Sequence, residues 1–201
     1  MEATSPQAGR PRDPALEQAI LAAAVDVFAE QGFARTTVEE VARAARTGKA
    51  AIYRRWPSKT ALAIAAVRSL QTDIPVPDTG SLRGDLLSWA RHYTDGDKRA
   101  PILLANLIAD AGHDPELRRA SYEAIGKPPA DALRAVIDHW IGEGVVPRST
   151  PVELILAVIP SMAFRHVAVN RTALDAHTVT EIVDHILLPA LQHRPDRTIP
   201  C

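Results

Sequence analysis

The sequence TTVEEVARAARTGKAAIYRRW, residues 36–56, decides the fold, because it consists of two short helical segments with a tight break between them. We expect helices over residues 37–45 and 48–55, joined at Arg46 and Thr47. The small side chain of Ala42 lets the second helix cross the first closely. Apolar residues of both helices can then share one small core with a preceding helix: Val38, Val41, Ala45 and Ile52. This spacing predicts a helix-turn-helix, whose second helix enters the major groove of DNA by its N-terminal end.

The charge distribution also singles out this segment. The chain of 201 residues has 23 basic and 24 acidic side chains, so its formal charge is −1. Residues 32–60 alone contain seven basic and two acidic side chains, which gives this segment +5 and leaves −6 on the remaining residues. A local basic patch is expected of a surface that binds phosphates, because each cation displaces counterions from the nucleic acid. The alternative is a charged helix face that only contacts solvent.

The rest of the chain has the periodicity of helices. Apolar residues recur at helical spacing, most of the prolines fall between the apolar segments, and alternating strand patterns are absent from the sequence. The fold class is therefore all-α. Beyond the two helices above, we expect helices over residues 14–31, 58–71, 81–95, 101–111, 115–125, 129–143, 151–170 and 178–193.

Several of these helices have recognisable starts. Asp13-Pro14 and Asp114-Pro115 each place a capping carboxylate before a proline at the first helical position. Three pairs have the spacing of a capping box, in which a hydroxyl and a carboxylate three residues later both accept backbone N–H groups. The pairs are Thr37 with Glu40, Thr150 with Glu153, and Thr178 with Glu181.

Composition divides the chain into four parts. Residues 1–12 contain almost nothing apolar, so we expect an arm without fixed order, and we expect the same of the tail at 194–201. Residues 13–57 form the helix-turn-helix domain and residues 58–193 a larger helical domain. The stretch at 72–80, TDIPVPDTG, is the one internal segment that reads as a linker.

Cysteine content and hydropathy bear on the compartment. The single cysteine, Cys201, allows no intramolecular disulfide, which suits a reducing compartment. The first residues lack the apolar run of a signal peptide, and we expect no membrane span, because no stretch approaches about 18 uncharged apolar residues. We therefore expect a soluble, cytoplasmic protein without a membrane partner.

The segment GFARTTVEEVARAARTGKAAIYRRWPSK, residues 32–59, resembles the DNA-binding segment of the TetR family of transcriptional regulators. The shared features are the Gly32-Phe33 break, the Thr-Thr-Val-x-x-Val-Ala start of the next helix, and the Lys-x-x-x-Tyr-x-x-aromatic-Pro-Ser-Lys run. A weaker resemblance extends to the C-terminus through GEGVVP, the apolar helix at 151–170 and LLPALQ. The resemblance implies a homodimer that binds a double-stranded DNA operator, with a ligand-binding and dimerisation domain after the DNA-binding one.

The resemblance and the chemistry of the side chains together give the expected DNA contacts. Lys49 can donate to guanine O6 and N7 or, equally well, to a phosphate. Thr37 caps its helix and by resemblance holds a phosphate, as do Tyr53 and Arg55, whereas Trp56 is expected in the core. The full set is Thr37, Thr47, Gly48, Lys49, Ala50, Tyr53, Arg54, Arg55 and Lys59.

Three positions depart from the family pattern. Arg46 stands where such turns usually have glycine, Thr47 where an aliphatic residue is usual, and Ala51 where a hydroxyl is common. Either Arg46 adopts a left-handed conformation, which costs on the order of 1 kcal/mol, or the turn is built differently. These changes affect which bases are read rather than how the helix docks.

Residues 151–170, which include VELILAVIPSMAF, are apolar on nearly every side and predict a helix that is buried all round. Together with residues 178–193 this helix could form a four-helix interface across a two-fold axis, as the resemblance implies. The alternative is an internal core helix in a monomer.

The resemblance also implies a ligand pocket in the larger domain, where aromatic and polar side chains stand out. For each candidate, a role in the core or on the surface is the alternative. The candidates are Trp89, His92, Tyr93, Tyr122, Trp140, Met162, Phe164, Arg165 and His166. We find no catalytic constellation, no metal-ligand spacing and no phosphate-binding glycine loop, so we expect neither an enzyme nor a bound cofactor or metal.

The sequence therefore predicts a ligand-responsive DNA-binding regulator, a repressor that binds a palindromic operator as a dimer and is released by a small apolar molecule. The second hypothesis is a helical ligand-binding dimer that lacks operator-specific binding, which the substitutions at Arg46, Thr47 and Ala51 allow. A third hypothesis is an all-α enzyme, but no motif in the sequence places an acid, a base or a metal ligand.

Overall fold

The structure is a computed structural model that describes residues 13–70, 74–95, 97, 99–112 and 114–193. Over these residues it contains helices and loops and no strand, which confirms the all-α fold class. The expected arm at 1–12, the expected tail at 194–201 and the first residues of the expected linker lie outside the described residues. Residues 74–80 form an extended connection without helix.

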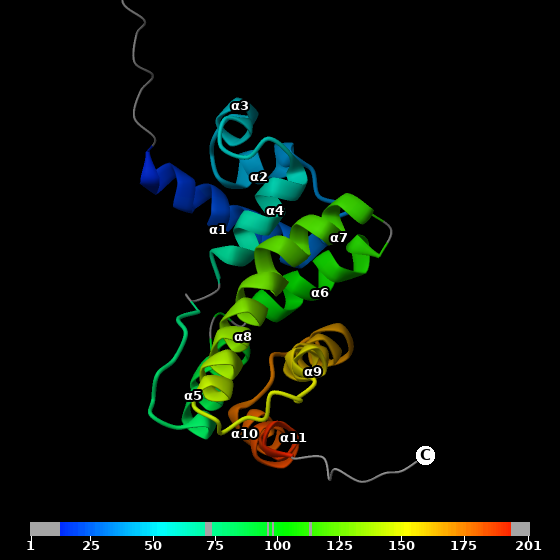
Figure 1. Cartoon of the computed structure of the whole chain (residues 1–201). Helices are drawn as coiled ribbons and strands as arrows, with labels where there is room; N and C mark the ends of the chain where they lie inside the picture. Colours follow the sequence, from blue (N-terminus) through cyan, green and yellow to red (C-terminus); the bar gives the residue numbers. More distant parts are fainter. Residues whose placement is uncertain (1–12, 71–73, 96, 98, 113, 194–201) are drawn as a thin grey trace, which may run out of the picture.

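Four helices form the N-terminal part of the molecule, called the head here: α1 (Pro14–Gln31), α2 (Val38–Ala44), α3 (Lys49–Tyr53) and α4 (Lys59–Arg68) (Figure 1). Local sequence explains their starts. The Asp13 carboxylate accepts hydrogen bonds from the N–H groups of Ala15 and Leu16, Thr37 and Glu40 form the expected capping box, and Ser58 caps α4.

The remaining helices form the body. They are α5 (Leu82–Ala90), a 3₁₀ turn at Arg91–Tyr93, α6 (Ala100–Ala111), α7 (Pro115–Ser121), α8 (Lys127–Gly142), α9 (Val152–Arg165), α10 (Ala176–Ile182) and α11 (Leu188–Gln192). Five-residue π-helical segments follow α7, α9 and α10, at Tyr122–Gly126, His166–Asn170 and Val183–Leu187. The helices expected at 151–170 and 178–193 therefore each contain a π segment, and the helix expected at 115–125 ends within one.

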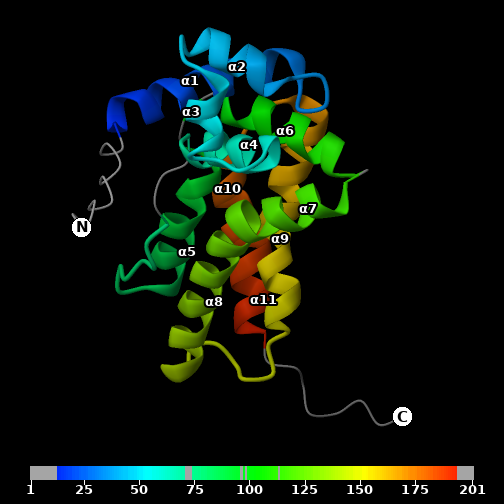
Figure 2. The same ribbon diagram turned by 90° about the horizontal axis from the view of Figure 1, so that it is seen from above.

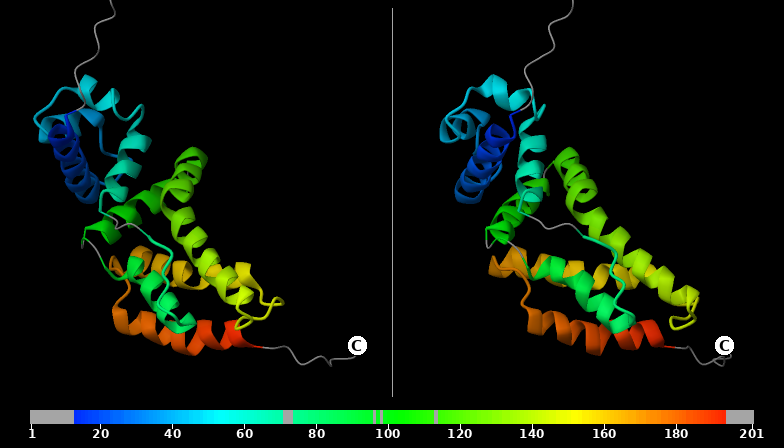
Figure 3. Two further views of the ribbon diagram at one scale, coloured as in Figure 1. Left: turned by 60° about the vertical axis from the view of Figure 1, so that its left-hand side comes forward. Right: turned by 90° about the vertical axis from the view of Figure 1, so that its left-hand side faces the viewer.

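Two apolar cores hold the molecule together. The first joins the head to the body, because Phe28, Ile52 and Leu62 share it with Leu103 of α6 and Leu117 of α7. The second lies among α5 and α8–α11, the helices that make up the lower part of Figure 3. Seen from above, α8, α9 and α11 extend away from the head (Figure 2). The head thus rests on α6 and α7, whereas the second core is built by the body alone.

Two of the three predicted capping boxes are wrong. Helix α9 begins after Pro151 with no side-chain cap, and Glu153 forms an ion pair with Arg134 of α8 instead. Helix α10 is capped by Asp175, whose carboxylate accepts a hydrogen bond of 2.8 Å from the N–H of Thr178. At α10, Asp175 therefore takes the capping position that the sequence pattern assigned to Thr178.

Helix α9 is not buried all round, contrary to the prediction from its composition. Ile155, Leu156 and Ile159 are buried in the second core, but Leu154 is 69% exposed. By length and composition alone, the segment Val152–Asn170 could cross a membrane, with 19 residues and a mean hydropathy of 1.7, although it contains Glu153 and Arg165. A helix with one face in the core and one apolar face outside also suits a contact between subunits.

Candidate DNA-binding and ligand-binding sites

The turn between α2 and α3 is built with Arg46 in the left-handed region, at φ 52°. The N–H of Arg46 donates to the carbonyl of Arg43 over 3.1 Å, and the N–H of Thr47 donates to the carbonyl of Ala42 over 2.9 Å. These two bonds are those of a Schellman motif, in which the left-handed position usually holds glycine. Arg46 therefore adopts the left-handed backbone conformation, and the turn is not built differently from the family pattern.

Helix α3 lies at the end of the molecule farthest from α10 and α11 (Figure 1). Its inner side is fixed by Ala51 and Ile52, which are buried in the head. Its outer side consists of side chains that the sequence predicted as DNA contacts, and they are exposed: Gly48, Lys49, Ala50, Tyr53 and Arg54. Thr47 beside them is half-buried. The start of α3 thus presents small residues and one cation to the outside.

Lys49 forms an ion pair with Glu39 of α2, and its ammonium group lies 5.6 Å from the centre of the Tyr53 ring. The hydrogen bond between the two side chains holds the pKa of Glu39 below its usual value and raises the pKa of Lys49. Both groups are therefore charged at neutral pH. An acid beside the expected base-reading lysine is a feature that the sequence-based prediction missed.

Thr37 is engaged at the start of α2. Its hydroxyl donates to the Glu40 carboxylate over 2.8 Å and accepts from the N–H of Glu40 over 3.3 Å. The N–H of Thr37 also donates to the Glu40 carboxylate. This backbone bond and, after it, the bond from the Thr37 hydroxyl lower the pKa of Glu40. Thr37 itself is exposed, so its cap lies at the surface.

The structure places Arg55 and Lys59 differently from the exposed cations of α3. The Arg55 side chain is 10% exposed and donates to the carbonyl of Ala51 over 3.1 Å. The Lys59 ammonium donates to the carbonyls of Phe33 and Thr36 over 2.8 and 3.0 Å and lies 4.4 Å from the centre of the Phe33 ring. Arg55 also reaches α1, because its Nε lies 3.9 Å from the Glu17 carboxylate, and Lys59 joins the start of α4 to the connection between α1 and α2. Trp56, predicted as core, packs half-buried against the first core.

A cavity of about 910 Å³ lies where the last turn of α4 meets the body. Most of its lining is apolar, with residues from α4, α6, the π segments and α9 such as Val67, Leu70, Leu104, Ile108, Ile125 and Val167. Four of the nine predicted ligand residues line it: His92, Tyr93, Tyr122 and Phe164. A pocket of this size and chemistry fits a small, mainly apolar molecule.

The other five predicted ligand residues are not among the residues that line this cavity. Trp89 is buried in the second core, where its indole N–H donates to the carbonyl of Pro129 over 2.8 Å. Trp140 donates to the Asp85 carboxylate over 2.8 Å. Met162 packs half-buried against the same core, Arg165 is exposed, and His166 Nδ1 lies 3.1 Å from the carbonyl oxygen of Met162.

Several polar groups belong to the residues around the cavity. His92 Nδ1 and Ser121 Oγ are buried without a hydrogen-bond partner in the described part of the chain. Burial lowers the pKa of His92 and raises that of Tyr93, so both are neutral at pH 7. Among the described residues no group of three or more His, Cys, Asp or Glu side chains could hold a metal ion. The unsatisfied groups can hydrogen-bond to a ligand or to water once the side chains adjust.

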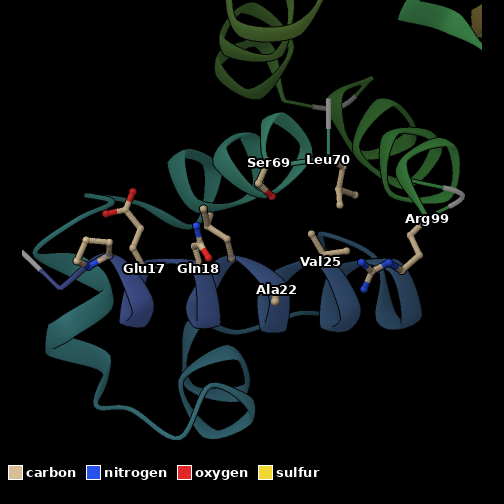
Figure 4. Close-up of a pocket in the computed structure, with 9 residues that line it drawn as sticks. Glu17, Gln18, Ala22, Val25, Ser69, Leu70 and Arg99 are labelled. Carbon is tan, nitrogen blue, oxygen red and sulfur yellow. The ribbon is translucent and has the colours of Figure 1, made fainter. Parts of the chain in front are cut away.

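A second, smaller hollow of about 520 Å³ runs along α1 (Figure 4). Glu17, Gln18 and Val25 line it from α1, and Arg99 closes one end. Arg99 donates to Asp26 of α1 over 2.6 Å and to Asp97 over 2.7 Å, and the Arg99 hydrogen bonds lower the pKa of Asp97 to about 2. Because Asp97 also lines the large cavity, Arg99 connects α1 with the wall of that cavity.

Comparison with known proteins agrees with this geometry. Residues 20–66 match the family model of bacterial regulatory proteins of the tetR family, and residues 76–186 match the model of the tetracyclin repressor-like C-terminal domain. The DNA-binding transcriptional repressor TetR of Mycobacteroides abscessus is 29% identical over 173 residues, which cover 85% of this chain and 90% of that protein. The HTH-type regulator YdeS of Bacillus subtilis is 28% identical over 87% of this chain and 89% of its own length.

The fold is also similar to solved structures. The TetR family transcription regulator SCO0332 aligns with a TM-score of 0.62 and 25% identity, over 86% of this chain and 96% of that one. The model of the C-terminal domain alone spans more than half of the chain, and the model of the DNA-binding domain covers α2, α3 and most of α4. With its helix-turn-helix head and helical body, this chain belongs to the TetR family of ligand-responsive, DNA-binding transcriptional regulators, which are not enzymes.

Proposed function

We propose that the protein is a homodimeric repressor, which binds a palindromic operator through α3 and leaves it when a small, mainly apolar molecule fills the 910 Å³ cavity. The observation that carries this proposal is the position of the cavity. Val67 and Leu70, at the end of the α4 segment, line it together with residues of the body. A ligand there contacts both the head and the body, so it can favour one arrangement of the two over another.

The exposed side of α3 supports major-groove binding. Lys49 and Tyr53 supply donors, while Gly48 and Ala50 let the backbone approach the base edges closely. We assign Thr47, Arg54 and Thr37 to the rim of this surface as contacts for phosphates. Arg55 and Lys59 act by holding the head rigid, since Arg55 lies beside the Glu17 carboxylate of α1 and Lys59 donates to the carbonyl of Phe33.

The exposed apolar side chains of the last helices support a dimer. Leu154 and Val169 are each 69% exposed, and Ile186 is also exposed. A two-fold axis through this face, with α9 and the segment from α10 to α11 packed against their partners, would cover them. Two copies of α3 would then contact half-sites about one helical turn, or roughly 34 Å, apart.

The regulatory step needs little energy. A coupling of about 1–3 kcal/mol between the ligand and the operator changes operator affinity about 5- to 150-fold. We further infer that residues 13–57 act as the DNA-binding domain and residues 58–193 as the ligand-binding and dimerisation domain, with the protein in the cytoplasm. His92, Tyr93, Tyr122 and Phe164 are the proposed ligand contacts.

Selection of bound fragments from the genome of the source organism, followed by footprinting, tests this function. We expect an enriched fragment with two symmetric protected half-sites, and loss of protection in Lys49→Ala. The Arg148→Ala variant, which removes an exposed cation between α8 and α9, is the control and should protect as the wild type does. Uniform recovery of all fragments, with ligand binding intact, would instead favour the ligand-binding dimer without operator specificity.

A further inference from the structure

We propose that Arg171 senses an anionic group on the ligand, so that the effector is an apolar molecule with a carboxylate, and that Asn106 passes this signal from Arg171 to the end of α1. This inference rests on the proposed function and adds the class of ligand and the route of the signal. It is carried by a chain of hydrogen bonds that begins at the cavity wall and ends on the backbone of the head.

Asn106 lies on α6 and is half-buried between the head and the body. Its amide nitrogen is 3.2 Å from both the Phe28 and the Ala29 carbonyl oxygens, which lie in the last turn of α1. Its carbonyl oxygen accepts a hydrogen bond of 2.6 Å from the Arg171 guanidinium. One side chain therefore satisfies carbonyls at the end of α1 and holds Arg171 at the same time.

Arg171 follows the π segment His166–Asn170 and lines the cavity. Its backbone is in the left-handed region, at φ 57°. This conformation costs a residue other than glycine roughly 1–2 kcal/mol, so surrounding contacts must hold it in place. Such a residue can move to a relaxed conformation when its side-chain partner changes, which is what a sensing position requires.

The charges around the cavity favour an anion. Arg118 and Arg171 line it, and neither forms an ion pair with a carboxylate in the described part of the chain. Of the two carboxylates in the lining, Asp97 is paired with Arg99, whereas Asp95 accepts only a bond of 2.9 Å from the neutral Thr94 hydroxyl. The two exposed guanidinium groups thus outnumber the one carboxylate without a cationic partner among the described residues. An apolar cavity with two available guanidinium groups suits an apolar body that carries a carboxylate.

A carboxylate near Arg171 would compete with Asn106 for the guanidinium. A charged acceptor makes a hydrogen bond roughly twice as strong as a neutral amide oxygen does, so a carboxylate that pairs with Arg171 through Nη1 displaces Asn106. Asn106 then loses the partner that fixes its orientation toward Phe28 and Ala29. The end of α1, and with it the Gly32–Thr36 connection to α2, becomes free to move relative to the body.

A second connection between the cavity wall and α1 provides the internal control. Asp97, Arg99 and Asp26 link the same two regions, but this connection reaches α1 through an exposed ion pair, whereas the bonds from Asn106 to Phe28 and Ala29 are partly buried. An exposed ion pair contributes little, with a typical value of about 0–1 kcal/mol. We therefore assign the signal to Asn106 and expect Asp26→Asn to retain it.

The ligand class is tested by calorimetric binding to the full chain, without DNA, with two pairs of probes that differ in charge: dodecanoate with dodecanamide, and 2-naphthoate with 2-naphthamide. We expect at least one acid to bind about tenfold or more tightly than its amide, and Arg171→Gln to abolish this preference while Arg148→Gln retains it. Equal binding of acid and amide in both pairs, or binding of neither acid, contradicts the proposed class.

The route is tested by titrating a selected operator fragment with wild type, Asn106→Ala, Asn106→Leu and Asp26→Asn, each with and without the acid that binds best. We expect the acid to weaken operator binding at least about fivefold in the wild type and in Asp26→Asn. In both Asn106 variants the acid should bind at least as tightly as to the wild type, because no amide oxygen competes for Arg171, yet it should change operator binding less than about twofold. Thermal unfolding of the four proteins shows that all are folded at the temperature used.

The possible failures can be told apart. If the acid binds and both Asn106 variants still release the operator as the wild type does, the route is wrong while the proposed function stands. If Asp26→Asn loses the response instead, the signal travels through Arg99. If the wild type binds no preferred fragment, the proposed function itself fails, although the preference for acids over amides in the binding assay can still hold.

Discussion

Arg46 shows how a single residue can depart from a family pattern without changing the fold. The turn keeps both hydrogen bonds of a Schellman motif although its left-handed position has a side chain. The motif is fixed from outside, because Val41 and Ile52 on the two flanking helices are buried in the same core. The strain is therefore tolerated at a position where an exposed arginine adds a positive charge near the expected DNA surface.

We predict that Arg46→Gly raises the free energy of unfolding by about 1 kcal/mol, because glycine adopts φ 52° without steric strain. Urea denaturation of the purified protein measures this change. The control is Arg43→Gly, which makes the same exchange inside α2 and should lower stability by roughly 1 kcal/mol. Destabilisation of similar size in both variants would show that Arg46 is not strained.

Asp85 is a buried carboxylate that sequence patterns did not mark. It accepts hydrogen bonds from the N–H and hydroxyl of Thr79 over 2.6 and 2.7 Å, and from the Trp140 indole over 2.8 Å. Burial alone would raise the pKa of Asp85, but these bonds outweigh it and lower the pKa. The carboxylate thereby ties residue 79, at the end of the connection from the head, to α5 and α8.

We predict that Asp85→Asn lowers the free energy of unfolding at pH 7 by about 2–3 kcal/mol, since an amide cannot accept all three bonds. The sign of the pH dependence follows from the lowered pKa. The stabilisation by Asp85 is present above the unfolded pKa of about 3.9 and disappears as pH falls through the folded value. Urea titrations at pH 7 and pH 3 should therefore show a smaller difference between variant and wild type at the lower pH. A difference that is constant with pH would contradict this role.

At the scale of the element, the ion pair between α2 and α3 sets how Lys49 is presented. Glu39 holds the ammonium group in the free protein and places a negative charge beside the expected phosphate-binding surface. A base contact by Lys49 must therefore compete with Glu39. Glu39 therefore weakens binding to DNA of unrelated sequence more than it weakens binding to an operator that offers Lys49 a well-placed acceptor.

We predict that Glu39→Gln tightens binding to unrelated DNA by about 2- to 10-fold at low salt and narrows the ratio between operator and unrelated DNA. Fluorescence anisotropy with labelled operator and scrambled duplexes measures both affinities. Glu30→Gln removes an exposed acid from α1 and serves as the control. Equal tightening by the two variants would mean that only net charge matters.

Helix boundaries could be predicted where the signals are local. Asp13 and Thr37 set the starts of α1 and α2, and Gly32 sets the end of α1. Each of these residues acts through its own backbone neighbours. The start of α10 was misassigned because Asp175 and Thr178 both have capping chemistry, and only the path of the chain decides between them.

The candidate sites were predictable to different degrees. The exposed face of α3 could be predicted because its residues lie on one short helix. The partners of Arg55 and Lys59 could not, since the Lys59 ammonium reaches backbone 23 to 26 residues away. The cavity draws its lining from several helices, so aromatic content alone could not separate Tyr93 from Trp89.

At the scale of the whole molecule, α3, which carries the expected DNA surface, lies at the end opposite to α10 and α11 (Figure 1). The cavity lies where the head meets the body. A change in the cavity can therefore alter the angle of the head while the apolar face stays fixed. In a dimer joined through that face, a small change of angle changes the distance between the two α3 helices.

We predict that Leu154→Glu together with Val169→Glu converts a dimer into monomers, because burying unpaired charges in an interface costs several kcal/mol. Sedimentation velocity measures the state at micromolar concentration. Val76→Glu is the control, since this valine is exposed in the connection to α5. A double variant that remains dimeric would place the interface elsewhere.

DNA binding by α3 is tested most directly by the affinity of the protein for its selected operator at increasing salt, with Lys49→Ala and a scrambled duplex measured alongside. We predict a strong preference for the operator, an affinity that falls about 10³-fold or more between 50 and 200 mM salt, and a clear loss of that preference in the variant. Equal affinity for both duplexes, unchanged by salt or by Lys49→Ala, would contradict the conclusion that α3 reads DNA.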